Sequence, residues 1–136
     1  MNLNVRIAFY WLLIVIGYIF HSLFNLTGLV FGIDIKSPEA TGSVPIGMHI
    51  FRIVVELFPF LWAAILLRTT NSSIKLINFV LAILFGLLNL VHLAEGVVKE
   101  FSDYAQVVLM FFILIVNIFL ILDAKNWRKA AENTLF

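Results

Sequence analysis

Four long apolar segments dominate the chain and limit the folds that are open to it. Each is about 20 residues long, which is the length that an α-helix needs to cross the hydrocarbon core of a bilayer. Hydrophobic residues make up 62% of the sequence and charged residues only 12%, too little polar surface to cover a water-soluble globule. We therefore predict an all-α integral membrane bundle of four transmembrane helices, at about residues 7–31, 48–67, 75–98 and 104–122.

The 136 residues are expected to form a single four-helix transmembrane domain, residues 1–136, because the four spans leave no room for a separate soluble domain. The first apolar segment is expected to stay in the protein, since it is longer than the core of a secretory signal, about 7 to 15 residues. The sequence contains 0 cysteines, which excludes disulfides and chemistry that depends on a redox-active cysteine pair.

The second segment carries the most informative polar residues. At a helical pitch of about 100° per residue, His49, Arg52 and Glu56 lie on one stripe of an otherwise apolar helix. Ionisable side chains inside a membrane are costly, so they indicate a functional site by default. Arg52 and Glu56 are spaced i, i+4 and are expected to form an ion pair.

A proline interrupts the same segment three residues after Glu56. Pro59 removes the hydrogen-bond donor for the carbonyl of Val55, which predicts a kink at this level. On a regular helical wheel, Trp62 is predicted to face away from the polar stripe.

The first and third segments each show a face of small and polar residues at helical spacing, which is typical of packed membrane helices. In the first segment this face holds Tyr10, Gly17, His21, Asn25 and Gly28, and in the third it holds Asn78, Ala82, Gly86, Asn89, His92 and Gly96, with Glu95 beside it. We expect the third and second helices to pack closely together, and the first helix to complete a polar cavity between them.

The fourth segment has few polar residues and is predicted to be a supporting helix. Gln106 and Asn117 are its only strongly polar members. It is followed by a tail, residues 123–136, in which basic side chains surround Trp127 as in a membrane-interface anchor. These basic side chains are Lys125, Arg128 and Lys129.

The basic residues of the loops predict the orientation. The amino end, the second link and the tail share one side of the membrane and carry most of the lysines and arginines, which places both termini in the cytoplasm of a multi-pass cell membrane protein. At about 1.5 Å per residue, His21, Asn89 and His92 then lie about 21 to 26 Å from the cytoplasmic ends, level with Arg52.

These side chains define a polar cluster in the outer half of the bilayer. Its predicted members are His21, Asn25, His49, Arg52, Glu56, Asn89, His92 and Glu95. Such a cluster fixes helix packing in many membrane proteins. The alternatives are a site for a lipid, quinone or other amphiphile between the helices, ligation of haem or a metal, and a proton pathway. Haem and metal are not favoured, because the Glu-x-x-His order of bundle di-iron sites is reversed here and not repeated.

We expect a non-enzymatic protein, an accessory or assembly subunit, with the membrane-embedded binding site as the alternative. No Gly-rich phosphate loop, Gly-x-Ser-x-Gly turn or His-Glu-x-x-His sequence is present. The expected partners are the lipid bilayer and other membrane proteins or further copies of this chain, and no nucleic acid.

Overall fold

Four membrane-length helices form the protein. The computed structural model describes residues 2–36, 40–69, 71–99 and 103–132, and within these ranges it contains helices and loops but no strand. The helices long and apolar enough to cross a membrane are Leu3–Val30, Ile46–Arg68, Ser72–Val98 and Tyr104–Ala130. The prediction of an all-α membrane bundle of four helices is confirmed.

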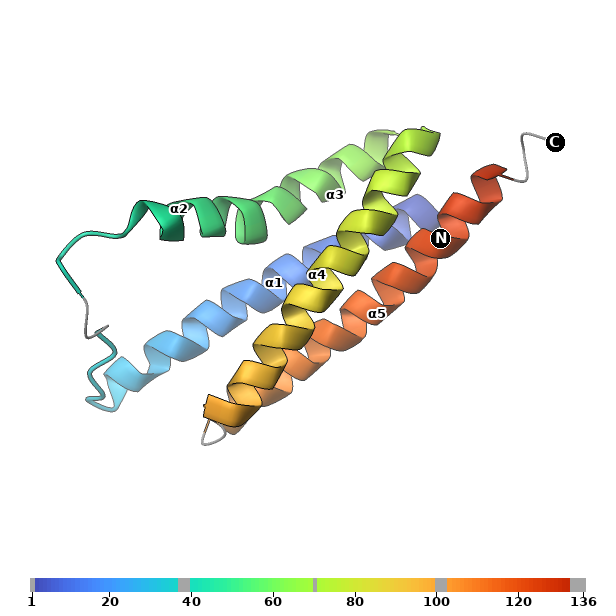
Figure 1. Ribbon diagram of the computed structural model, residues 1–136. Helices are drawn as coiled ribbons and strands as arrows, with labels where there is room; N and C mark the ends of the chain where they lie inside the picture. Colours follow the sequence, from blue (N-terminus) through green and yellow to red (C-terminus); the bar gives the residue numbers. More distant parts are fainter. Residues whose placement is uncertain (1, 37–39, 70, 100–102, 133–136) are drawn as a thin grey trace.

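Three of the four membrane helices are continuous, and the second is built from three pieces (Figure 1). The continuous ones are α1 (Leu3–Val30), α4 (Ser72–Lys99) and α5 (Tyr104–Glu132). The second consists of α2 (Ile46–Arg52), the π-helical turn η1 (Ile53–Leu57) and α3 (Phe58–Arg68). α5 continues to Glu132, so the segment predicted as a tail is helical as far as the described residues reach, and residues 133–136 lie outside them.

A glycine terminates α1. The backbone N–H of Gly32 donates to the carbonyl of Leu29 at 3.1 Å, and that of Ile33 donates to the carbonyl of Gly28 at 3.0 Å. This pair of bonds is a Schellman motif, which needs a left-handed residue after the helix. Gly32 has φ +76°, a conformation that glycine adopts without steric cost.

Side-chain caps start the last two helices. Asn71 Oδ1 accepts from the backbone N–H of Ser73 at 2.9 Å, and Asp103 Oδ1 accepts from that of Gln106 at 3.2 Å. Each bond satisfies a backbone donor that has no partner within the helix.

The helices pack as a curved row in which α4 lies along α5, α5 along α1, and α1 along α3. The expectation that the second and third membrane helices pack closely is wrong. α3 and α4 meet near the end of the bundle where α3 ends and α4 begins, with Trp62 Nε1 3.0 Å from Asn78 Oδ1. α2 diverges from α4 towards the other end of the bundle (Figure 1). α5, predicted as a supporting helix, instead packs on both α1 and α4.

Much of the buried apolar core lies towards the end of the bundle that holds both described termini. Its fully buried members include Trp11 and Ile14 of α1, Leu66 of α3 and Leu120 of α5. Arg6 and Asp123 form a bidentate ion pair between α1 and α5, with Nη2 to Oδ1 at 2.6 Å.

The basic and aromatic residues at this end pack on one another instead of forming an open anchor. Trp127 is only 6% exposed, and the ammonium of Lys75 lies 5.4 Å from the centre of its ring. The guanidinium of Arg128 lies 5.1 Å from the ring of Phe79. These cation–π contacts tie α4 to α5.

Two of the four glycines on the predicted packing faces lie at close helix contacts. A Cβ on Gly17 would come within 2.5 Å of Ile113 Cγ1, and one on Gly86 within 3.0 Å of Ile121 Cδ1. Gly28 instead faces side chains of the loop after α1, and a Cβ on Gly96 meets no described atom within 4 Å. The close approach therefore joins α5 to α1 and α4.

We predict that Gly17→Ala destabilises the bundle while Gly96→Ala does not. The added methyl at Gly17 overlaps Ile113, and overpacking of this kind costs about 1 to 3 kcal/mol. Alanine at Gly96 meets open space and gains helix propensity of about 1 kcal/mol or less. Thermal unfolding in detergent measures both, and equal midpoints for the two variants would contradict the contact between α1 and α5.

Candidate functional site

Asn78 links three helices through one oxygen atom. The indole N–H groups of Trp11 on α1 and Trp62 on α3 both donate to Asn78 Oδ1 on α4, at 2.9 and 3.0 Å. Trp62 is 6% exposed, so its ring lies inside the bundle, a contact with α4 that the helical wheel did not predict. The buried amide nitrogen of Asn78 has no hydrogen-bond partner among the described residues. This junction holds α3 against the rest of the bundle.

A second chain of hydrogen bonds crosses the middle of the bundle. The hydroxyl of Tyr18 donates to Asn89 Oδ1 at 2.7 Å, and Asn89 Nδ2 donates to Asn117 Oδ1 at 2.6 Å. Asn117 Nδ2 completes the chain by donating to the carbonyl of Ala82 at 3.0 Å. All three side chains are buried, and every bond crosses between helices. Polar groups in hydrocarbon must be satisfied internally, and this chain meets that requirement.

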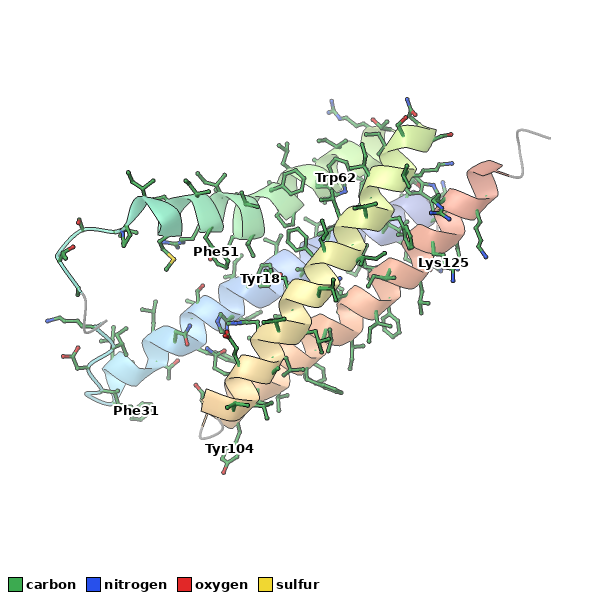
Figure 2. The ribbon with its side chains drawn as sticks, in the orientation of Figure 1. Tyr18, Phe31, Phe51, Trp62, Tyr104 and Lys125 are labelled. Atoms are coloured by element: carbon green, nitrogen blue, oxygen red, sulfur yellow. The ribbon has the colours of Figure 1, made fainter. Side chains whose placement is uncertain are left out.

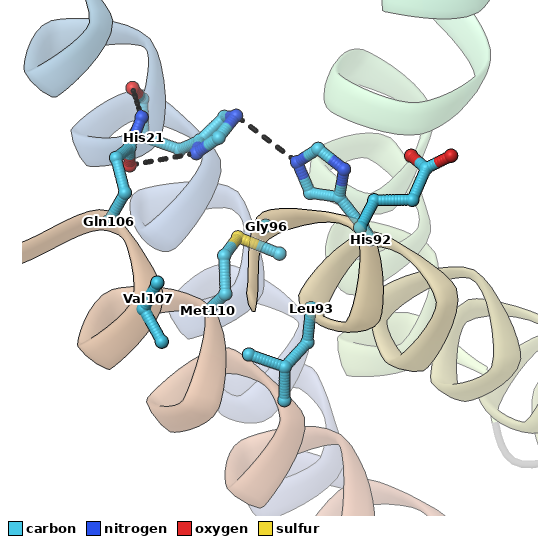
Figure 3. Close-up of a pocket in the computed structure, with 8 residues that line it drawn as sticks. His21, His92, Leu93, Gly96, Gln106, Val107 and Met110 are labelled. Atoms are coloured by element: carbon cyan, nitrogen blue, oxygen red, sulfur yellow. Dashed lines mark hydrogen bonds between the residues drawn. The ribbon is translucent and has the colours of Figure 1, made fainter. Parts of the chain in front are cut away.

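The third set of hydrogen bonds surrounds His21 (Figure 3). The buried amide of Gln106 donates from Nε2 to the carbonyl of His21 at 3.2 Å. It also donates from Nε2 to Asn25 Oδ1 at 2.6 Å. Its Oε1 therefore faces His21 Nδ1, 2.9 Å away, and the histidine must be the donor. His92 Nε2 lies 3.2 Å from His21 Nε2, so in the uncharged pair His92 donates to His21.

A π-helical turn separates the outer part of the second membrane helix from its inner part. The backbone N–H of Phe58 donates to the carbonyl of Ile53, five residues back, and the buried Pro59 follows directly. A wide turn of this kind accommodates a proline that lacks its own N–H, and it bends the helix. The predicted kink is realised as this turn. Beyond it, α2 contains no buried residue.

The divergence of α2 opens a groove of about 740 Å³ between α2 and η1 on one side and α4 on the other, with α1 as its floor. Apolar side chains form much of its walls, including Met48 and Phe51 of α2 and Leu84 and Leu88 of α4. Figure 2 shows the α2 side chains, with Phe51 labelled, lying apart from those of α4. We call this space the outer groove.

An ion pair lies at the side of the outer groove. Arg52 Nε is 3.3 Å from Glu56 Oε2, as the i, i+4 spacing predicted. The two side chains are 55% and 31% exposed, so the pair is not enclosed in the core. Together with Tyr18 and Ser22 of α1, it also borders a smaller groove of about 290 Å³ on the other side.

The outer groove contains seven of the eight residues predicted for the polar cluster. These are His21, Asn25, Arg52, Glu56, Asn89, His92 and Glu95. His49 is exposed on α2 and does not line the groove. A small cavity of about 150 Å³ adjoins the cluster, lined in part by His21, His92 and Gln106 (Figure 3).

Sequence reasoning did not include Tyr18, Ser22 or Gln106 in the cluster. Tyr18 follows Gly17 directly and is buried among the other helices. For Gln106 and Asn117, the signal in the sequence was that each is an isolated amide in an otherwise apolar segment. An amide in an otherwise apolar membrane helix needs an internal partner, so each pointed to an interhelical contact.

The described residues do not form an evident metal site. Within the described ranges, no group of three His, Cys, Asp or Glu side chains is placed to hold one metal ion. The arrangement instead offers hydrogen-bond donors and acceptors beside an apolar wall, which is the composition of a small-molecule pocket.

Comparisons with protein-family models, curated proteins and solved structures give no significant match to this chain.

We predict that Gln106→Leu destabilises the outer half of the bundle by about 1 to 3 kcal/mol, because it leaves His21 Nδ1 and the Asn25 amide oxygen without a partner. The matched change Val108→Ala lies two residues away on the exposed side of the same helix and is expected to have a small effect. Chemical unfolding in detergent compares the two. Equal losses would show that the Gln106 hydrogen bonds do not contribute to stability.

Proposed function

We propose that this small polytopic membrane protein is non-enzymatic and binds an amphiphilic molecule in the outer groove. The observation that carries the proposal is a space of about 740 Å³ that joins an apolar wall to a row of polar side chains. Small-molecule sites in proteins have volumes of about 300 to 1,000 Å³ and combine apolar walls with a few placed polar groups.

The arrangement of the lining supports an elongated ligand with one polar end. Leu84, Leu88 and Val91 follow one another along α4 at helical spacing and offer a continuous apolar track. Arg52 and Glu56 lie across from this track, and Asn25 and His92 lie near the outer end. An alkyl chain on the track and a polar group at the ion pair would use both surfaces.

A second candidate function is that of an accessory or assembly subunit, and the exposure of α2 supports it. Ile46, Ile50 and Phe51 are each at least 50% exposed, and no residue of α2 is buried. A helix of another membrane protein, or of a second copy of this chain, could cover this surface. In this alternative the outer groove is an interface and not a ligand site.

The proposed location is the cell membrane, with both termini in the cytoplasm. The support is the distribution of basic residues: Arg6, Arg68 and Lys75 belong to the end of the bundle that holds both termini. In this orientation the outer groove lies in the outer half of the bilayer.

Filling the groove tests the proposed function. We predict that Leu88→Trp, which places an indole in the groove, reduces the amount of co-purifying amphiphile by about tenfold or more. Leu90→Trp on the same helix is the matched control, because Leu90 is 49% exposed and lines none of the described cavities. Mass spectrometry of the purified protein measures the ligand, and thermal unfolding checks that both variants are folded.

Two results would contradict the proposal. One is a wild-type protein that carries only the lipids of the surrounding membrane in their bulk proportions. The other is an enriched amphiphile that remains equally abundant in Leu88→Trp and Leu90→Trp.

A further inference from the structure

We infer that the outer groove selects an amphiphile with an uncharged head group that carries a carbonyl acceptor and a hydroxyl donor, and that it rejects anionic lipids. The inference rests on the proposed function and adds the chemical class of the ligand. It depends on the charges and hydrogen-bonding groups that line the groove.

The cation of the groove is already paired. Arg52 is the only lysine or arginine among the described residues that line the groove, and its Nε lies 3.3 Å from Glu56 Oε2. A phosphate at Arg52 would therefore approach the Glu56 carboxylate as well. Like charges at such distances repel strongly where water is scarce, so an anionic head group is disfavoured.

The hydrogen bonds of the two histidines limit the positive charge that they can add to the groove. His21 Nδ1 donates to Gln106, and the two Nε2 atoms face each other at 3.2 Å. With the nitrogens in this position the pair holds at most one extra proton, because two imidazolium rings would direct their N–H groups at each other.

The ion pair retains hydrogen-bonding capacity for an uncharged head group. A guanidinium has five N–H donors, and among the described residues Arg52 uses one of them, for Glu56. The carboxylate of Glu56 has further acceptor positions. A ligand carbonyl can accept from Arg52 while a ligand hydroxyl donates to Glu56, and the ion pair stays intact. A diacylglycerol presents both groups, through an ester carbonyl and its hydroxyl, whereas an alkyl quinol presents hydroxyls and no carbonyl.

The test compares lipids that share their chains and differ in charge. The full-length protein in detergent at about pH 8 is titrated with dioctanoylglycerol, dioctanoylphosphatidylglycerol and a decyl-substituted benzoquinol, and the dissociation constants are measured. We expect dioctanoylglycerol to bind about tenfold or more tightly than dioctanoylphosphatidylglycerol. The benzoquinol offers hydroxyl donors without a carbonyl, so binding as tight as that of dioctanoylglycerol would show that the groove does not select for the carbonyl acceptor.

Glu56→Gln tests the charge argument directly. Removing this carboxylate releases Arg52, so the variant is expected to bind dioctanoylphosphatidylglycerol about tenfold more tightly than the wild type does. Asp34→Asn is the matched control, since Asp34 lies in the exposed loop after α1 and does not line the groove. It should leave the preference unchanged.

The outcomes separate the two proposals. If the wild type binds dioctanoylphosphatidylglycerol as tightly as dioctanoylglycerol, the charge selection is wrong, although the groove still binds an amphiphile. If Glu56→Gln and Asp34→Asn change the preference equally, the effect belongs to overall charge and the inference is also overturned. If none of the three probes binds, both the inference and the proposed function are wrong.

Discussion

Polar groups inside a membrane must find their partners within the protein, and the packing of this bundle depends on that constraint. Asn78 accepts from two tryptophans, and thereby connects α4 with α1 and α3. Asn89 and Asn117 connect α4 with α1 and α5. Each of these hydrogen bonds forms in only one register of the helices that it joins, so together they fix how the helices pack.

The same constraint explains why the outer part of the second membrane helix stands apart. α3 is held to the bundle through Trp62, but α2 has no buried residue and makes no comparable hydrogen bond among the described residues. The π-helical turn at Ile53–Leu57 then changes the direction of the helix, and the divergence leaves the outer groove open. The groove is therefore open because the interhelical hydrogen bonds that hold α3 to the bundle do not extend to α2.

Periodicity and membrane thickness were sufficient to predict the four helices and the stripe that brings His21 and His92 together. They were not sufficient to predict the contacts of Trp62. The π-helical turn holds one extra residue, so the side chains after it are rotated by about 100° from the directions that a regular helical wheel gives. The central role of α5 was missed for another reason. Hydropathy records Gln106 and Asn117 as isolated polar residues and does not show which partners they bind on α1 and α4.

α2 diverges from α4 and leaves a groove of about 740 Å³ with the Arg52–Glu56 pair at its side. A crystal structure grown from a lipidic mesophase measures this most directly. We expect a separated α2 and an elongated ligand density along Leu84 and Leu88, with one end near Arg52. A structure in which Phe51 packs directly against Leu88, with no space for a ligand, would contradict it.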